Sequence, residues 1–308
     1  MTAVETPPAT VRDKRAAVRV PRRRRVSART ETALGFSAWR GPAGMVSRIF
    51  VYGLLVFVFA GPLLALLSSS FSHVTDPSKL TLIPTDFTLD NFRRAIDRDV
   101  LGYLLNSFIV VGGGLLLQVF VSVSASYALA RKKFPFLRLI FLLILSTMML
   151  PEEILAIPLS IVLADVNLIG SLLGMIIPVG AWGFSILVMT EFMKEIPAEL
   201  EEAARIDGAG DLRIFWSIVL PLCRPALGVI GIFGFTMIWD QYMLPLLVAT
   251  DSHQFTLPLA LRGLRSDEEV GLGVVIAASL LALLPSVLAF LAMQRQFMRG
   301  LTSGAVKG

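Results

Sequence analysis

The sequence predicts an all-α membrane protein with six transmembrane helices, and three observations carry this prediction. Hydrophobic residues occupy 55% of the 308 positions and charged residues only 17%, whereas roughly 25% is usual in soluble domains. The mean hydropathy is +0.73. Six continuously apolar runs can each cross about 30 Å of hydrocarbon, where helices satisfy their own backbone groups. The runs cover residues 47–71, 102–130, 137–163, 170–193, 225–249 and 271–294.

The first 45 residues form a basic segment in front of the membrane domain, which we expect to cover residues 46–308. Residues 1–45 hold ten Lys/Arg and three Asp/Glu. An arginine run such as PRRRRVSAR, residues 21–29, also occurs in segments that bind nucleic acid. A disordered cytoplasmic tail beside anionic lipid headgroups explains the composition better, so no nucleic-acid partner is expected.

The positions of Lys and Arg orient the six spans. Besides the N-terminal tail, basic residues occur in ARKKFPFLR at 130–138, around the segment 196–221 and in the C-terminal tail 295–308. Because cytoplasmic loops are enriched in Lys and Arg, both termini are predicted to be cytoplasmic. The opposite loops, with mixed charge, are 72–101, 164–169 and 250–270.

Prolines and glycines interrupt several spans. Proline removes an amide donor and kinks a helix, and such kinks are tolerated where protein or a cavity satisfies the backbone again. Kinked helices around an internal path favour a transporter over a plain anchor. The glycine run at 112–114 predicts that a neighbouring helix approaches closely. The prolines are Pro151, Pro158, Pro178, Pro245 and Pro285.

The segment 196–221, between the fourth and fifth spans, predicts two short helices joined by a hinge. Pro197 suits the first helical turn, where the acids at 199, 201 and 202 are also favoured. Gly208 suits the left-handed position that closes this helix. Asp211 is predicted to cap the second helix, which Pro221 is expected to end. The segment is too polar to insert, so it is predicted to be a cytoplasmic helix-turn-helix.

This segment resembles the coupling motif of permease subunits in bacterial ATP-binding-cassette importers. The motif reads Glu-Ala-Ala, three residues, Gly, nine residues, Ile-x-Leu-Pro, and residues 202–204, 208 and 218–221 match it. In that family the segment is a coupling helix that sits in a cleft of the ATPase subunit. The resemblance implies that the ATPase-coupling residues are Glu201, Glu202, Ala203, Ala204, Asp207, Gly208 and Ala209.

Other stretches resemble the smaller six-span subunit of the maltose-type carbohydrate permeases, over residues 46–308. They include FTLDNFRRAI at 87–96, LLNS at 104–107 and the ending GLTSGAVKG at 300–308. The resemblance implies a type I importer permease fold, with Gly304 and Lys307 as C-terminal contacts to the ATPase subunits. The fifth span departs from the family pattern: it has Trp-Asp-Gln-Tyr at 239–242, so the acid and the amide are exchanged.

The partners follow from the same resemblance. A second permease subunit would form a heterodimer with this chain in a bacterial plasma membrane. Two ATPase subunits would bind ATP and Mg²⁺, and an extracytoplasmic solute-binding protein would dock on the loops 72–101 and 250–270. This chain has no phosphate-binding G-x-x-x-x-G-K-S/T loop, so we expect no enzyme activity and no bound cofactor. Its single Cys223 and two distant histidines predict no metal site.

Several polar side chains are predicted to lie near the middle of the membrane. Ionisable groups are costly there and seldom face lipid. They would line the translocation path and accept hydrogen bonds from a polyhydroxylated solute, with the aromatic rings stacking on a sugar. Alternatively, the acids bind arginines or backbone donors of the second permease, or lie at an unwound helix end near the outer interface. The candidates are Glu152, Glu153, Trp239, Asp240, Gln241 and Tyr242.

Two other functions compete with the importer. A proton-coupled secondary transporter could use the buried acids, but no inverted repeat is visible and the segment 196–221 would have no purpose. A membrane enzyme would need clustered histidines or acids at one depth, which the sequence lacks. Within the importer reading, the resemblance implies a sugar, an oligosaccharide or a polyol as the solute.

Overall fold

The computed structural model describes residues 42–74, 76, 82–84, 86–267 and 269–305, and all regular structure in these ranges is helical. The chain divides into two compact units, with the boundary between Gly61 and Pro62. The basic tail predicted for residues 1–45 lies outside the described residues up to position 41. Residues 42–45 form the first turn of the first described helix, α2 (Pro42–Ser70).

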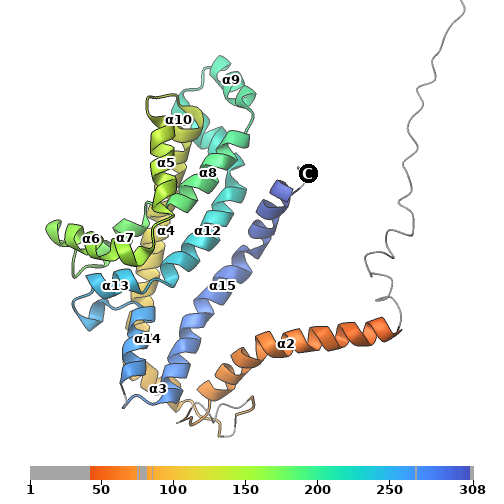
Figure 1. Ribbon diagram of the computed structural model, residues 1–308, viewed down its shortest axis with the longest axis vertical. Helices are drawn as coiled ribbons and strands as arrows, with labels where there is room; N and C mark the ends of the chain where they lie inside the picture. The colour runs from red at the N-terminus through yellow and green to blue at the C-terminus, as the bar shows by residue number, and fades with distance from the viewer. Residues whose placement is uncertain (1–41, 75, 77–81, 85, 268, 306–308) are drawn as a thin grey trace, which may run out of the picture. The chain divides into compact units, whose positions relative to one another are not determined.

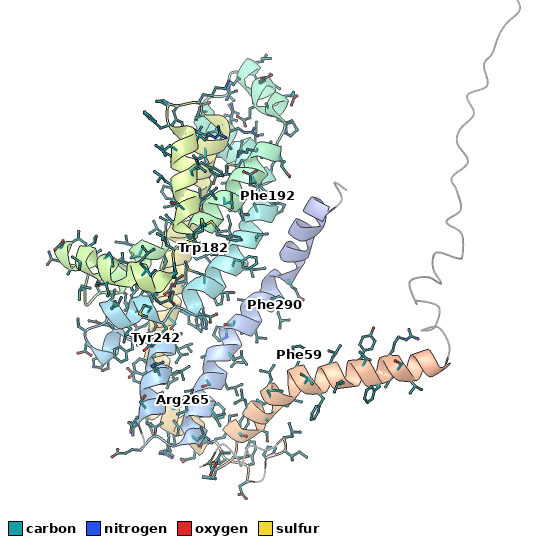
Figure 2. The ribbon with its side chains drawn as sticks, viewed as in Figure 1. Phe59, Trp182, Phe192, Tyr242, Arg265 and Phe290 are labelled. Carbon is teal, nitrogen blue, oxygen red and sulfur yellow. The ribbon has the colours of Figure 1, made fainter. Side chains whose placement is uncertain are left out.

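Helix α2 is apolar along most of its length. Its stretch Met45–Ser70 has a mean hydropathy of 2.5, and none of the most apolar window is buried. Phe59, for example, projects from the helix with 73% of its surface exposed (Figure 2). Soluble proteins rarely leave so large a contiguous apolar surface in water, so α2 has the properties of a membrane span.

The second unit contains the remaining helices, which Figure 1 shows as a bundle with α9 and α10 at one end and α3 and α14 at the other. Short helices and loops join the longer ones. The helices are α3 (Asp90–Asp97), α4 (Val100–Arg131), α5 (Leu137–Thr147), α6 (Glu152–Asp165), α7 (Leu172–Val179), α8 (Gly183–Glu195), α9 (Ala198–Ile206), α10 (Asp211–Ile214), α11 (Leu220–Leu222), α12 (Arg224–Trp239), α13 (Met243–Val248), α14 (Leu257–Ser266) and α15 (Leu272–Ala305).

Length and hydropathy give six membrane spans when each bent helix pair counts as one, which confirms the predicted fold class. Four segments of the described chain qualify as single spans, and two further spans are broken in the middle. The pair α5 and α6 bends by 107°, and the pair formed by Asp211–Leu222 and α12 bends by 71°. The single spans are Met45–Ser70, Val100–Arg131, Leu172–Glu195 and Leu272–Ala292.

The bend in the third span occurs where the sequence predicts an interruption. Pro151 has the extended backbone of an N-cap and directly precedes α6. Helix α5 ends at Thr147, ahead of Leu150, as expected because proline disfavours helical geometry in the residue before it. Pro158 and Pro285, in contrast, lie inside α6 and α15 without ending them. The predicted irregularity is therefore confirmed at Pro151 but not at these two positions.

Helix α4 packs closely against α7 and α12 because its glycines leave room. A Cβ placed on Gly114 would lie 2.7 Å from Val179 Cγ2 and 3.1 Å from Ile238 Cδ1, and one on Gly113 would lie 2.9 Å from Ile176 Cδ1. The 2.7 and 2.9 Å distances are too short for a real side chain and the 3.1 Å distance is tight, whereas a Cβ on Gly112 would meet nothing within 4 Å. The close approach predicted from the glycine run is thus confirmed, and small residues at membrane helix interfaces commonly have this role.

Buried hydroxyl groups join α4 to α8. The Oγ atoms of Ser122 and Ser185 are 2.6 Å apart, and Ser126 Oγ donates to the Ile186 carbonyl at 2.8 Å. Within α8, Thr190 Oγ1 donates to the same carbonyl at 2.7 Å, so only the two serine bonds connect the helices. Hydrogen bonds between membrane helices contribute about 0.6 kcal/mol each on average, so this row fixes the register of the two helices more than it adds stability.

Candidate functional site

The hairpin formed by α9 and α10 closes through a Schellman motif at Gly208. Its φ is +80°, which glycine adopts without the steric penalty of a side chain. The Ala209 amide donates to the Ala204 carbonyl at 2.9 Å, and the Gly208 amide donates to the Arg205 carbonyl at 3.1 Å. This bond pair defines the motif. The predicted left-handed hinge at Gly208 is confirmed.

The second half of the segment differs from the prediction at two residues. Gly210 occupies the N-cap position of α10, and Asp211 is the first helical residue without a capping bond. Pro221 lies inside α11 rather than ending the preceding helix. A π-helical stretch, Phe215–Val219, comes directly before it. Such wider turns accommodate an irregular bonding pattern within a helix, and proline imposes one because it lacks an amide donor.

The predicted coupling residues divide between two faces of the hairpin. Glu201 is buried, and Ala204 and Ala209 pack in part against an apolar cluster that includes Met193 and Phe215. The outer face also carries two apolar side chains, Ile206 and Leu212, which are 86% and 77% exposed. The predicted residues that face outward are Glu202, Ala203, Asp207 and Gly208.

An ion-pair network holds the inner face of the hairpin to the end of α4. Arg131 Nε lies 2.7 Å from Glu201 Oε1, an ion-pair contact that lacks the geometry of a hydrogen bond. Arg131 Nη2 donates to the Ile196 carbonyl at 2.7 Å. Arg205 Nη2 lies 3.5 Å from Glu201 Oε2. Arg131 is absent from the predicted site residues because in the sequence it is one of four basic residues in 131–138. The position of Glu201 one turn before Arg205 was the available signal, but it could not identify Arg131.

A second, exposed ion pair lies beside the first. Lys132 Nζ is 2.5 Å from Asp211 Oδ2, and Arg205 Nη2 is 3.5 Å from Asp211 Oδ1. The hydrogen bond to Asp211 raises the pKa of Lys132 above its ordinary value. Asp211 thus binds basic side chains at the position where a helix cap was predicted.

Of the two C-terminal residues predicted to contact the ATPase subunits, the structure describes one. Gly304 lies in the last turn of α15, which extends to Ala305. Lys307 lies outside the described residues. The contact assigned to both residues therefore stays a prediction.

Two of the predicted path residues meet in a cavity between α6, α7 and α13. Gln241 Nε2 donates to Glu152 Oε2 at 3.1 Å. The cavity has a volume of about 140 Å³, and apolar residues such as Leu159, Pro178 and Met237 form most of its lining. A carboxylate and an amide at an apolar wall can together bind a hydroxyl-bearing ligand.

Three other predicted path residues, Tyr242, Glu153 and Asp240, lie apart from the Glu152–Gln241 pair. Tyr242 lines a larger cavity of about 860 Å³ together with Arg262 and Arg265 of α14, and the Arg262 guanidinium lies 5.3 Å from the centre of the Tyr242 ring. Figure 2 shows Tyr242 beside α13 and Arg265 on α14. Glu153 and Asp240 are exposed.

Trp239 is part of the core instead of lining a path. Its exposed fraction is 3%. Its ring stacks on Phe235 at 5.5 Å and lies 5.3 Å from the Phe108 ring. Its neighbours cover the ring in this structure, and the predicted stacking of Trp239 on a sugar stays a prediction.

Comparison with known proteins adds a family and several relatives. The family described as binding-protein-dependent transport system inner membrane component matches residues 118–300. The melibiose/raffinose/stachyose import permease protein of Bacillus subtilis (strain 168) is 35% identical over 251 residues, covering 80% of this chain and 91% of the relative. The sn-glycerol-3-phosphate transport system permease protein of Yersinia pestis bv. Antiqua (strain Antiqua) is 38% identical over 200 residues, covering 64% of this chain and 71% of the relative.

A further relative and a solved structure agree with these matches. The diacetylchitobiose uptake system permease protein of Streptomyces coelicolor is 29% identical over 265 residues, covering 84% of this chain and 87% of the relative. A chain from the crystal structure of a bacterial ABC transporter involved in the import of the acidic polysaccharide alginate has a TM-score of 0.72 at 21% identity. The match covers 88% of this chain and 99% of that chain, and it shows a shared fold.

Proposed function

The chain belongs to the family of binding-protein-dependent transport system inner membrane components, and on that premise we propose that it is the permease subunit of an ATP-driven importer for a carbohydrate or polyol. The observation that carries the proposal is the α9–α10 hairpin. Its Schellman turn at Gly208 and its exposed Ile206 and Leu212 form a protruding surface. An ATPase subunit with an apolar cleft would fit that surface. The chain itself would bind no cofactor, with ATP and Mg²⁺ held by the ATPase subunits.

The solute class rests on the relatives. Two are named for import or uptake of oligosaccharides and one for sn-glycerol-3-phosphate transport, so the shared chemistry is a ligand with several hydroxyl groups. The Glu152–Gln241 pair suits such a ligand, because solute hydroxyls can replace the hydrogen bond between the two side chains. The cavity beside Tyr242, about 860 Å³, falls in the size range of roughly 300–1,000 Å³ usual for small-molecule sites.

The two outer loops form one surface for a solute-binding protein. Arg98 Nη1 lies 2.8 Å from Asp267 Oδ2, and Arg94 Nη2 donates to the carbonyls of Glu269 and Val270, both at 3.3 Å. These bonds join the loop 72–101 to the loop 250–270, as a shared docking surface requires. In the proposed importer both termini would be cytoplasmic, and a second permease subunit would complete the path.

ATP hydrolysis in the partners would drive alternating access. Closure of two ATPase subunits displaces the hairpins of both permeases, and the helix bundles then rotate as rigid bodies around the solute. Gly208 and Pro221 are positioned to support this role, since the first shapes the hairpin and the second leads the chain back to α12.

A matched glycine pair tests the hairpin assignment. A Cβ on Gly208 or on Gly210 would meet nothing within 4 Å, but only Gly208 has positive φ. Gly208→Val therefore strains the turn by about 1–2 kcal/mol or more, whereas Gly210→Val fits its extended backbone. In proteoliposomes containing all partner subunits, we expect Gly208→Val to lose most ATP-dependent solute uptake and Gly210→Val to retain it, at equal membrane levels. Equal uptake by both variants would remove the basis of the assignment.

A separate measurement tests the importer class. The wild-type chain should co-purify with an ATPase subunit, and uptake should require ATP inside the vesicles and persist with a proton ionophore. Uptake that needs a proton gradient and no ATPase subunit would instead support the secondary transporter.

A further inference from the structure

The end of α4 and the inner face of α9 share the most deeply buried charge in the described chain. Among the described residues, Glu201 is the only charged residue that the structure buries, with 3% of its surface exposed. The side chain of its partner Arg131 is 12% exposed. A buried charge is costly unless it is paired and hydrogen-bonded. Glu201 accepts a hydrogen bond from Arg205 at 3.5 Å and is paired with Arg131 at 2.7 Å. Arg131 is the nearer and the more buried of the two cations, so it compensates most of the buried charge.

Arg131 contacts the segment at two points. Its Nε atom pairs with Glu201 in the first turn of α9, and its Nη2 atom donates to the carbonyl of Ile196, just before that helix. One guanidinium thus fixes both the entry of the chain into α9 and the rotation of α9 about its axis. The fork of donors in arginine suits such a double contact, which a lysine could not reproduce.

Helix α9 has little else that holds it to the bundle. Its inward side chains are Glu201 and the small Ala204, while Glu202, Ala203 and Ile206 face outward. An alanine contact buries little apolar surface, and the burial of apolar area sets the strength of such packing. The Arg131 contacts are consequently the main side-chain connection between α9 and the helices that span the membrane.

Helix α4 carries this connection to the opposite end of the bundle. It is a continuous helix of 32 residues, or about 48 Å at 1.5 Å per residue. At its other end Asn106 Nδ2 donates to the carbonyls of His253 and Phe255, at 2.7 and 3.0 Å, and Ser107 Oγ accepts from the Leu257 amide at 2.8 Å. One helix thus contacts both the hairpin and the loop 250–270.

We propose that Arg131 and Glu201 are positioning residues that transmit movement of the α9 hairpin into α4, and through α4 to the outer loop 250–270. This inference rests on the proposed importer function. A pair that served only stability would hold α9 in place without affecting how much ATP is used for each solute. A pair that transmits movement sets the number of ATP molecules hydrolysed per solute imported. Without the pair, α9 would move with the ATPase subunit while α4 stays in place, and ATP would be hydrolysed without transport.

The test measures the ATP hydrolysed per solute imported, with the complete transporter in proteoliposomes. Glu201→Gln keeps the shape of the side chain and removes its charge. We expect the variant to assemble with its partners and to hydrolyse about tenfold more ATP per solute than wild type. Stimulation of the ATPase by the solute-binding protein should fall by a similar factor.

The matched control is Glu191→Gln, which removes an exposed acid paired with Lys194 at 2.8 Å on α8. It should leave the ATP hydrolysed per solute unchanged.

The exchanged pair Arg131→Glu with Glu201→Arg makes the test decisive. It restores opposite charges in reversed order, and we expect it to recover several-fold of the lost coupling. If Glu201→Gln does not assemble, the exchanged pair decides: assembly with coupling supports the proposal, and assembly without coupling or no assembly overturns it. A wild-type ratio in Glu201→Gln also overturns it. A wild-type chain that neither co-purifies with an ATPase nor uses ATP would instead refute the importer function itself.

Discussion

The two ends of the second unit are each joined by an arginine–carboxylate pair, but the pairs differ in burial. At the hairpin end, Arg131 and Glu201 lie 2.7 Å apart with side chains 12% and 4% exposed. At the opposite end, which is the outer end in the proposed orientation, Arg98 and Asp267 lie 2.8 Å apart with side chains 42% and 39% exposed. The two ion pairs thus have nearly equal N···O distances, but one is buried and the other is exposed to solvent. The comparison teaches that solvent exposure, rather than distance, decides how much the fold depends on a pair.

The outer end relies on neutral hydrogen bonds where the hairpin end relies on charge. Buried Asn91 of α3 donates to the carbonyls of Ser70 and Ser72, at 3.0 and 2.8 Å. Gly273 of α15 leaves the space for this amide, since a Cβ there would lie 2.6 Å from Asn91 Oδ1. An end held by several neutral bonds can lose one contact without exposing a buried charge. Loss of one partner at the hairpin end leaves such a charge.

The largest effect is expected when one partner of the buried pair is removed. Arg131→Met leaves Glu201 with only the half-exposed Arg205, 3.5 Å away. We expect the free energy of unfolding to fall by about 3 kcal/mol, at the lower end of the usual range because Arg205 remains. Thermal unfolding of the detergent-solubilised chain measures the change.

A double variant separates stability from coupling at the same site. Arg131→Met combined with Glu201→Met removes both charges, and an apolar pair is often as stable as a buried ion pair. We expect the double variant to regain most of the lost stability but not the coupling of ATP use to transport. A double variant as unstable as Arg131→Met would show that the packing of the side chains, and not their charge, matters here.

The second effect, at the outer end, should be smaller. Asn91→Leu removes two hydrogen bonds and leaves the carbonyls of Ser70 and Ser72 without this donor. The expected loss is about 2 kcal/mol in the free energy of unfolding, seen as a lower midpoint of thermal unfolding. Asp97→Ala, on the exposed side of the same helix, is the matched control. A loss as large as that of Arg131→Met would contradict the idea that the fold depends less on the neutral hydrogen bonds of Asn91 than on the buried ion pair.

The sequence predicts the features that depend on local backbone chemistry. The six spans follow from apolar length, the bend at Pro151 from proline geometry, and the turn at Gly208 from the tolerance of glycine for positive φ. The glycine run in α4 likewise predicts close packing. Each of these properties belongs to one residue or one short run. Neighbouring helices were not needed to infer them.

The features that the sequence does not predict depend on which helix lies opposite. Glu199, Glu201 and Glu202 look alike in the sequence, and only the phase of α9 against Arg131 selects Glu201 for burial. Asp211 faces Lys132 across a gap of 79 residues and so becomes a pairing residue instead of a cap. Trp239 likewise becomes a core residue because Phe108 and Phe235 pack against it.

The smallest effect is expected at the exposed pair, and its dependence on pH and salt completes the comparison. The hydrogen bond from Arg98 holds the pKa of Asp267 below its ordinary value. A carboxyl with a lowered folded pKa stabilises the fold above its unfolded pKa, about 3.9, and this contribution disappears as pH falls through the lower folded pKa. Arg98→Gln should therefore change the midpoint of thermal unfolding barely or not at all at pH 7, and any difference should shrink as the pH falls below about 3.9 and vanish below the folded pKa of Asp267. Any difference at pH 7 should vanish in about 1 M salt, where the screening length is about 3 Å, whereas the deficit of Arg131→Met should persist because water and ions do not reach a buried pair. A large deficit in Arg98→Gln that survives high salt would show that burial does not distinguish the two ends.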